Sequence, residues 1–534
     1  MERRNFIRLS LTASAGALLT NPLGALSLKR LTTCDFEDRV LVLVQLNGGN
    51  DGINTIIPID QYGIYANLRP DIKIPDSGIN KFINLDNTLS IADQVGLHPK
   101  MTDFKSMYDD GLMNIIQGVS YNSMNKSHFR STDIWMSGID GDPSSIETGW
   151  LGRYFEDAYQ TTLDYPLGIQ VGNKKNARIY KGEHNHDSLN LTGQDPSGFY
   201  SIVSSLGGDY LANIPSSDYG DKIKYIQDVD QFSNTYGNTI SNAFNISSNA
   251  ISYPNHDLAD QLKTVARLIN GGLKTKVYLV TLNGFDTHNS QAEATDSTIG
   301  GHATLLTELS ESVKAFYDDL KAMGHDERVL TSTFSEFGRK VKQNGNLGTD
   351  HGGIAPMFLF GPSVTPGITG TNVNLSEANS SNNWQLESYQ HDYRQVFATI
   401  LQDWFGTKDD IVDKSIMPQA GGDSFTTKKI NFINSDKRVD PTCYHGLLVD
   451  SFVNENSPLK TYPNPINEFM NVEFDVLTRG NLQIIDLTGK IVYQQQINRP
   501  TKSLMINLSH IPPGGYTLNI ISESHHLSKN ILKN

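Results

Sequence analysis

Four apolar runs, rich in aliphatic and β-branched residues, constrain the fold of this 534-residue chain more than any other feature. Runs of this kind suit strands that are buried on both faces, as in a parallel sheet. They span residues 40–46, 113–119, 277–282 and 329–334. Elsewhere, apolar residues recur at three- and four-residue steps, which indicates amphipathic helices. The predicted helices span residues 258–269, 304–323 and 396–405.

This alternation of strands and helices predicts an α/β domain over about residues 37–430. Its expected architecture is a mostly parallel sheet with helices on both faces. In such a domain, ligands bind beyond the carboxyl ends of the strands. Functional residues are therefore expected directly after the apolar runs.

Residues of the types that bind metals follow three of the predicted strands and recur in the next loop. They are Asp51, Asp286, His288, Glu336, Asp350 and His351. Each also has a structural interpretation: Asp51 as a turn former, Asp286 with His288 as a helix-capping pair, and Glu336 with Arg339 as an ion pair. Together at one edge, however, the carboxylates would repel each other without a cation. Carboxylate and imidazole ligands suit Zn, Fe or Mn.

Several other polar residues have two interpretations. Ser127 is a candidate nucleophile at a helix start, where a dipole favours an oxyanion, or simply the helix N-cap. Arg339 or Arg394 can bind an anion with the planar guanidinium. His391 can complete a metal site or lie at the surface, and His184-Asn185-His186-Asp187 can be a metal loop or a solvated turn.

The composition excludes two classes of protein. The 38% hydrophobic content allows a sizeable core, so wholesale disorder is excluded. A net charge of −14, with no basic run beyond the extreme N-terminus, argues against a nucleic-acid partner. Cys34 and Cys443 have no metal-binding spacing, so they form one disulfide in an oxidising compartment or remain two unrelated thiols.

The N-terminus has the pattern of an export signal. Arg3 and Arg4 precede a short apolar run from Leu9 to Leu19, and such a run is too short to span a bilayer. Paired arginines before a large apolar residue resemble a twin-arginine signal, and an ordinary Sec signal is the alternative. We expect residues 1–28 to be removed, and we expect the mature chain to have no transmembrane helix.

The C-terminus predicts a separate β domain after a linker at residues 431–458. Short alternating runs separated by turns, between residues 459 and 534, indicate a small β-sandwich. The segment also resembles the type A sorting domain of type IX secretion in Bacteroidota. The resemblance rests on YPNP at 462–465, DLTGK at 486–490 and PGGY at 513–516. It implies export by the type IX machinery, followed by release or surface attachment, whereas an adhesive β-sandwich without a sorting role is the alternative.

The body of the chain resembles the family called domain of unknown function 1501. The resemblance covers roughly residues 38–430 and rests on six motifs in the order of the family. They are LHP at 97–99, SHF at 127–129, GFDTH at 284–288, SEFGR at 335–339, TDHGG at 349–353 and DYR at 392–394.

That family is grouped with the alkaline phosphatase and sulfatase superfamily, so the resemblance implies an alkaline-phosphatase-like fold with a two-metal hydrolytic site. Carried over by motif, Asp51 would be the strand-one carboxylate and Glu336 a bridging or outer acid. Asp286 and His288 would serve one metal ion, and Asp350 and His351 the other.

The leading hypothesis is a hydrolase of phosphate or sulfate esters that acts outside the cell with divalent ions such as Zn, Mg, Ca or Mn. Its expected substrate is a small-molecule or glycan ester, and its expected catalytic residues are Ser127, Glu336 and Arg339. One alternative is a non-catalytic surface protein that binds a glycan or an anion through the same pocket. Another is an exported scaffold, whose acidic residues would be scattered in space.

Overall fold

The computed structural model describes most of the chain. The described residues are 38–139, 146–159, 163, 165–172, 177–183, 188–191, 236–417, 422–439, 459–462, 466, 469–477, 480–486, 490–497, 501–521 and 526–533. The chain divides into two compact units, of which one spans Asp35–Val439 and the other includes Asp440–Asn534. Among the described residues, no helix combines the length and the apolar character needed to cross a membrane.

The first unit is built on a sheet of nine strands among the described residues. β1 (Val40–Asn47) is central, and β8 (Val277–Asn283) and β9 (Val329–Phe334) run parallel to it on either side. β12 (Ala355–Phe360) is antiparallel to β9 and to β5 (Met113–Ser120). The other strands are β6 (Gly168–Val171), β7 (Ser188–Leu191), β13 (Gly367–Thr369) and β14 (His391–Asp392). The order is β13-β5-β12-β9-β1-β8-β6-β7, with β14 beside β5, so the predicted mostly parallel sheet is confirmed.

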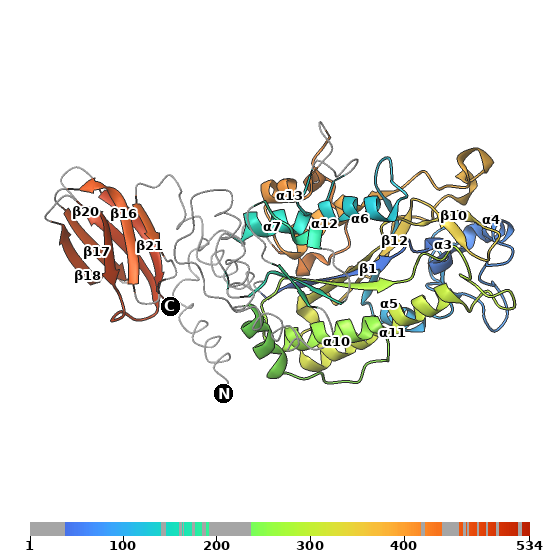
Figure 1. Ribbon diagram of the computed structural model, residues 1–534, viewed down its shortest axis with the longest axis horizontal. Coiled ribbons are helices and arrows are strands. Elements are labelled where there is room, and N and C mark those ends of the chain that lie inside the picture. The colour runs from blue at the N-terminus through green and yellow to red at the C-terminus, as the bar shows by residue number, and fades with distance from the viewer. Residues whose placement is uncertain are drawn as a thin grey trace, which may run out of the picture. The chain divides into compact units, whose positions relative to one another are not determined.

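Helices cover both faces of this sheet, as the sequence predicted (Figure 1). Successive residues of a strand point to opposite faces, so Val42 and Val44 join one apolar cluster while Leu41 and Leu43 join the other. One face is covered by α5 (Thr102–Asp109), α10 (Asp257–Asn270) and α11 (Gly301–Met323). The other is covered by α6 (His128–Ser137), α7 (Trp150–Ala158), α12 (Tyr393–Thr399) and α13 (Asp409–Ser415).

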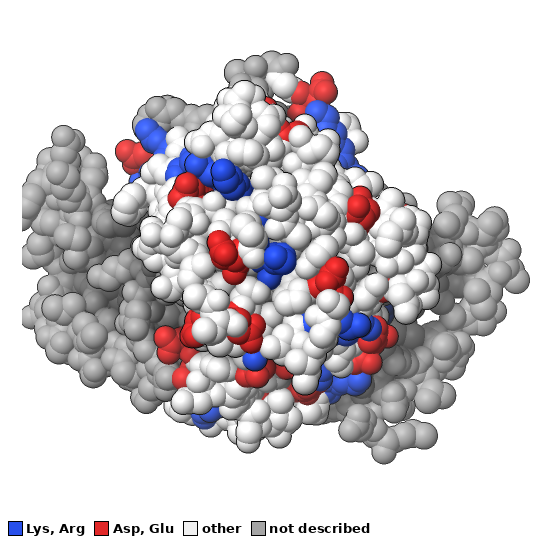
Figure 2. Space-filling view, turned by 90° about the vertical axis from the view of Figure 1, so that its right-hand side faces the viewer, with Lys and Arg blue, Asp and Glu red and all other residues white. Residues whose placement is uncertain are grey.

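Short elements follow the strands that carry the candidate ligands. α3 (Gly52–Thr55) and α4 (Tyr62–Leu68) follow β1, and β10 (Arg339–Gln343) pairs with β11 (Thr349–His351) after β9. A small sheet consists of β2 (Ile56–Pro58), β3 (Ile83–Asn84) and β4 (Val95–Leu97). Figure 2 views the molecule from the side of α4 and β10 and shows acidic and basic side chains interspersed on that face.

Single helical turns complete the first unit. The 3-10 turns are Ile59–Gln61, Ala177–Tyr180, Asp326–Arg328, Leu375–Glu377, Ser380–Asn382, Phe425–Thr427 and Ser435–Lys437. A π-helical turn, Ile400–Trp404, continues α12. The helix predicted at 396–405 therefore exists, but it begins three residues earlier and changes its winding near its end.

The second unit consists of antiparallel strands in two sheets. One sheet contains β15 (Leu459–Tyr462), β16 (Phe469–Leu477) and β19 (Thr501–Asn507). The other contains β17 (Gly480–Asp486), β18 (Ile491–Ile497), β20 (Gly514–Ile521) and β21 (His526–Lys533). Both sheets contribute to one apolar cluster, for example through Val472 and Ile484. This agrees with the small C-terminal β domain predicted from the sequence.

Candidate metal centre

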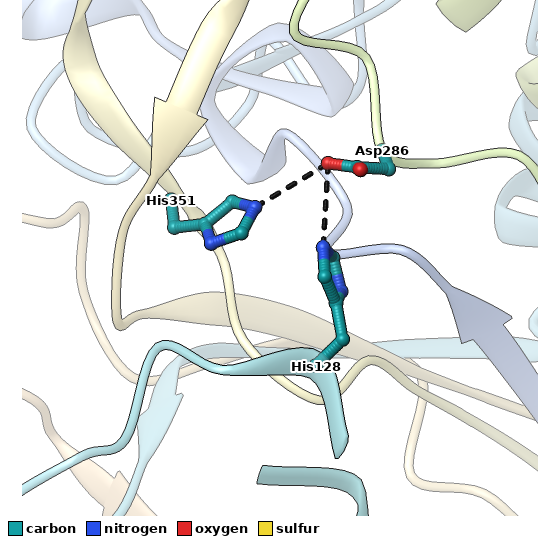
Figure 3. A group of neighbouring side chains, drawn as sticks. All are labelled: His128, Asp286 and His351. Atoms are coloured by element: carbon teal, nitrogen blue, oxygen red, sulfur yellow. Dashed lines mark hydrogen bonds and ion pairs between the residues drawn. The ribbon is translucent and has the colours of Figure 1, made fainter. Parts of the chain in front are cut away.

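Segments far apart in the sequence bring a carboxylate and three histidines together. Asp286 and His288 follow β8, His351 ends β11, and His128 is the first residue of α6. Three of these side chains point toward one another in Figure 3, where Asp286 lies between His128 and His351. The position beyond the carboxyl end of β8 agrees with the general location of sites in α/β sheets.

One carboxylate oxygen is the centre of this cluster. Asp286 Oδ1 lies 3.4 Å from Nε2 of His128 and 3.3 Å from Nε2 of both His288 and His351. The Nε2 atoms of His288 and His351 are themselves 2.9 Å apart. His128, Asp286 and His351 each offer a ligand atom within 4.8 Å of the others.

The second nitrogen of each imidazole is held by a different partner. Nδ1 of His128 lies 2.9 Å from Glu336 Oε1, and Nδ1 of His288 lies 3.3 Å from Asp350 Oδ1. Nδ1 of His351 lies 2.8 Å from the carbonyl oxygen of Lys126. Hydrogen bonds of this kind fix the orientation of a metal-binding histidine and favour the tautomer that presents the other nitrogen. All three rings therefore present Nε2 to the same place.

Three of these donor atoms, from His128, Asp286 and His351, fit a divalent cation. Ligands bound to zinc at about 2.0–2.1 Å with tetrahedral angles lie about 3.3–3.4 Å apart, and the contacts of Asp286 Oδ1 with His128 and His351, at 3.4 and 3.3 Å, match this spacing. In addition, the Nε2 atom of His128 is buried and makes no hydrogen bond with any described residue. A buried nitrogen that makes no hydrogen bond and faces a carboxylate and a further imidazole is an arrangement that a metal ion satisfies.

The charges around the cluster keep its carboxylate ionised. Burial alone would raise the pKa of Asp286, but the hydrogen bond and the positive charge of Arg339 outweigh it and lower this pKa to about 2. The hydrogen bond to Glu336 raises the pKa of His128, whereas burial lowers the pKa of His351. The centre thus contains an ionised carboxylate that can accept hydrogen bonds or bind a cation.

Arg339 has a different position from the one expected. We predicted that it binds a substrate anion, but it is 1% exposed and its guanidinium is engaged within the protein. It donates to the carbonyl oxygens of Gly48, Gly49, Phe285 and Thr349 and, at 2.8 Å, to Asp286 Oδ1. Arg339 therefore positions the ligand-bearing loops.

Asp51 also has other partners than the expected metal ion. Its carboxylate is fully buried and forms a two-point ion pair with Arg69, at 2.5 and 2.9 Å. Gln291 Nε2 donates to the same carboxylate at 2.5 Å. With both oxygens engaged, Asp51 lies outside the cluster of metal-ligand type that is found among the described residues.

The turn before Asp51 explains part of the motif Asn-Gly-Gly-Asn-Asp-Gly. Gly48 has a φ of 124°, and a Cβ atom at this position would lie 2.3 Å from the backbone nitrogen of Asp286. Only glycine allows such close approach of two backbones. The glycine therefore brings the loop after β1 against the loop that carries Asp286.

Glu336 and Asp350 lie next to the cluster, where each contacts one of its histidines. Glu336 is 1% exposed, and its Oε1 accepts from the backbone of Gly48 at 2.8 Å as well as from His128. Asp350 contacts His288 and, at 3.2 Å, Lys340. Each of these acids thus contacts the Nδ1 atom of one histidine of the cluster.

The serines near His128 have contrasting surroundings. Ser127 is exposed and is the N-cap residue of α6, without a side-chain capping hydrogen bond. Ser131 is buried, and its hydroxyl hydrogen-bonds the carbonyl oxygen of Glu336 and lies 3.0 Å from the hydroxyl of Tyr121. Of the two, only Ser127 is accessible to a substrate.

Two other candidates lie elsewhere. Arg394 is buried and pairs with Asp392 at 2.8 and 2.9 Å, and Asp392 caps α12. His391 pairs with β5 through β14, and it is not part of the cluster of metal-ligand type. The segment 184–187, the cysteines and the predicted signal at 1–28 lie outside the described residues.

The sequence interpretation missed His128. It assigned the chemistry of the segment Ser127-His128-Phe129 to the serine and treated the histidine as its neighbour. The available signal was the position of His128 at a predicted helix start after a predicted strand, which is a common place for functional side chains.

Two family models match parts of the chain. Residues 258–416 match the family described as protein of unknown function (DUF1501), and residues 460–534 match the secretion system C-terminal sorting domain. Both predicted resemblances are confirmed, the first over a shorter range than expected. The sorting domain indicates export to the cell surface or the extracellular space. No curated protein matches the chain.

Solved structures show weaker similarity. The PsFucS1 sulfatase from Pseudoalteromonas sp. is 10% identical, with a TM-score of 0.33, over 91% of this chain and 88% of that one. A protein in the alkaline phosphatase superfamily from Vibrio parahaemolyticus is 10% identical, with a TM-score of 0.30, over 87% and 82%. A DUF3244 family protein from Bacteroides vulgatus with an immunoglobulin-like β-sandwich is 21% identical, with a TM-score of 0.13, over 15% of this chain and 88% of that one. By its family models, the chain combines a region of the DUF1501 family with a C-terminal sorting domain.

Proposed function

We propose that the protein is an exported, metal-dependent hydrolase of phosphate or sulfate esters. The observation that carries this proposal is the convergence of three imidazole Nε2 atoms on Asp286 Oδ1. Imidazole and carboxylate ligands favour zinc, iron or manganese over magnesium and calcium, which prefer all-oxygen sites. Because Asp51 is paired with Arg69, we further propose one metal ion per chain in place of the two expected from the family resemblance.

The proposed roles follow from the contacts of each residue. A bound divalent cation would supply Lewis acidity and lower the pKa of a water molecule. His128, Asp286 and His351 would hold the ion and leave a position for water, while Glu336 holds the ring of His128 in place. Ser127 precedes His128 directly, and its exposed hydroxyl is a candidate for attack on the ester.

The test begins with metal analysis of the purified full chain. We expect about one equivalent of a transition metal and hydrolysis of 4-nitrophenyl phosphate or sulfate that a chelator abolishes. His128→Ala should lose both the metal and the activity, whereas the control His256→Ala, at a surface ion pair with Glu311, should retain both. A metal-free protein whose activity is unchanged by His128→Ala would refute the proposal.

A second candidate is a non-catalytic binding protein that retains a metal centre. It is favoured by the burial of Arg339 and Asp51, two groups that were expected to contact the substrate or a second metal ion. This candidate predicts metal binding without turnover. Turnover of 4-nitrophenyl phosphate or sulfate by the metal-loaded chain distinguishes the two, and Ser127→Ala then shows whether the hydroxyl takes part in hydrolysis.

A further inference from the structure

A cavity of about 440 Å³ lies beside the metal centre. His288, Asp350 and His351 form the wall that the cavity shares with the centre. The remaining lining residues are Lys126, Lys340, Asn382, Asn383 and Gln385. Small-molecule sites are usually lined mainly by apolar side chains, so a lining made of charges and amides indicates a strongly polar ligand.

The hydrogen-bonding groups that remain uncommitted in this cavity are mostly donors. The charges of Lys340 and Glu387 act on the ammonium group of Lys126. This ammonium forms no ion pair with any described residue. Lys340 contacts Asp350 at 3.2 Å, and an ammonium group has three N–H donors. A ligand that fills the cavity must therefore supply acceptors and negative charge.

The amide side chains that line the cavity, which include Gln385 and Asn383, add a smaller number of acceptors. Gln385 Nε2 donates to the carbonyl oxygen of His351 at 2.9 Å, whereas its Oε1 is buried without a hydrogen-bond partner among the described residues. Asn383 is exposed at the rim. Such amides pair well with hydroxyl groups, which both donate and accept.

The loop that supplies these amides is held in one conformation. Asn383 and Trp384 have φ values of 55° and 60°, in the left-handed region that non-glycine residues rarely adopt. Asn379 and Asn382 form a reciprocal capping box just before them, and the ammonium of Lys342 lies 4.6 Å from the centre of the Trp384 ring. Backbone strain maintained by its surroundings is typical of ligand sites.

Resting on the hydrolase function above, we propose that this cavity binds a sugar unit that carries a second anionic group beside the ester that is cleaved. Lys126 and Lys340 hold the second anion, and Asn383 and Gln385 contact hydroxyl groups. Two lysines line this cavity, which suits one anionic sugar unit better than a long polyanion. The lysines therefore set the specificity of the site.

Binding to two disaccharides that differ in one charge tests this proposal. One joins a hexuronate to a sulfated N-acetylhexosamine, and the other is the same compound with its carboxylate reduced to an alcohol. Calorimetric titration of the full chain, with the metal bound and after chelator treatment, measures both affinities. We expect the acidic disaccharide to bind about tenfold more tightly, as for one charge-assisted hydrogen bond, and this preference to fall as salt increases.

Lys126→Gln should remove this preference and leave the affinity for the reduced disaccharide within about twofold. Lys105→Gln is the matched control, because it removes the same charge from a lysine that pairs with Asp109 on α5 and does not line the cavity. Equal affinities for the two disaccharides, or an equal loss of both in Lys126→Gln, would overturn the proposal. Selective binding without hydrolysis would refute only the hydrolase, whereas hydrolysis of both disaccharides with equal kcat/KM would refute only the cavity assignment.

Discussion

Replacement of Glu336 by glutamine tests the metal centre without removing a ligand. The carboxylate accepts hydrogen bonds from His128 Nδ1 at 2.9 Å and from the backbone of Gly48 at 2.8 Å. Glutamine keeps the shape and one acceptor oxygen but removes the negative charge that makes the imidazole a better ligand. Loss of such an outer partner weakens metal binding by about 10–100-fold, or about 1.4–2.7 kcal/mol.

The pH also determines how far the metal affinities of the wild type and Glu336→Gln should differ. The hydrogen bond that Glu336 accepts from His128 raises the pKa of His128, so a proton competes with the metal ion as the pH falls through that raised value. In Glu336→Gln the pKa of His128 falls, and competition begins at lower pH. The affinity ratio between wild type and variant should therefore be largest near pH 8 and narrow toward pH 5. Asp286 remains ionised throughout, because its pKa is about 2.

The assay is competition for zinc with a coloured chelator between pH 5 and 8. Glu311→Gln is the matched control, because Glu311 also pairs with a histidine, His256, at 2.9 Å but away from the centre. The Glu311→Gln variant should bind zinc with the same affinity as the wild type. If Glu336→Gln binds zinc with unchanged affinity at pH 8 while His128→Ala does not bind it, the orienting role assigned to Glu336 is wrong.

Three other predictions concern stability and stoichiometry. Arg69→Met leaves the buried carboxylate of Asp51 without its partner, and urea unfolding should show a loss of about 3–5 kcal/mol, whereas an unchanged free energy of unfolding would contradict the buried ion pair. Burial lowers the pKa of His302 to about 4, so between about pH 4 and 6.5 the unfolded chain binds a proton that the folded chain does not. Stability should therefore rise with pH there by up to about 1.4 kcal/mol per unit, and His302→Gln should reduce this slope. Mass spectrometry of the native protein should give one metal ion per chain, and two ions would contradict the pairing of Asp51 with Arg69.

The sequence was sufficient to predict four strands of the central sheet of the first unit. The apolar runs became β1, β5, β8 and β9 because a strand buried on both faces must be apolar along its length. β12 was missed, and its run Ala355–Phe360 contains Pro356. Hydrophobicity also carries no information on strand direction, so the antiparallel pairing of β12 with both neighbours was not predictable from the pattern.

The candidate site was predicted in part. Asp286 and His288 follow β8, and His351 follows β9 by way of β10 and β11; β8 and β9 lie on either side of β1, so these side chains meet at one edge of the sheet. The pairing of Asp51 with Arg69 was not predicted, because Arg69 lies 18 residues away in a segment without a strong sequence signal. The direction of each carboxylate depends on such local partners, which composition and spacing do not encode.

Arg339 explains how this cluster can exist before a metal ion binds. Its single buried guanidinium contacts the loop after β1 through Gly49, the loop after β8 through Phe285 and Asp286, and β11 through Thr349. Because these are the segments that carry or adjoin the ligands, one side chain fixes their mutual positions. A site held in place in this way loses little conformational entropy when the ion arrives. It follows that substitution of Arg339 should disturb Asp286, His288 and His351 together, whereas substitution of one histidine removes only its own contact.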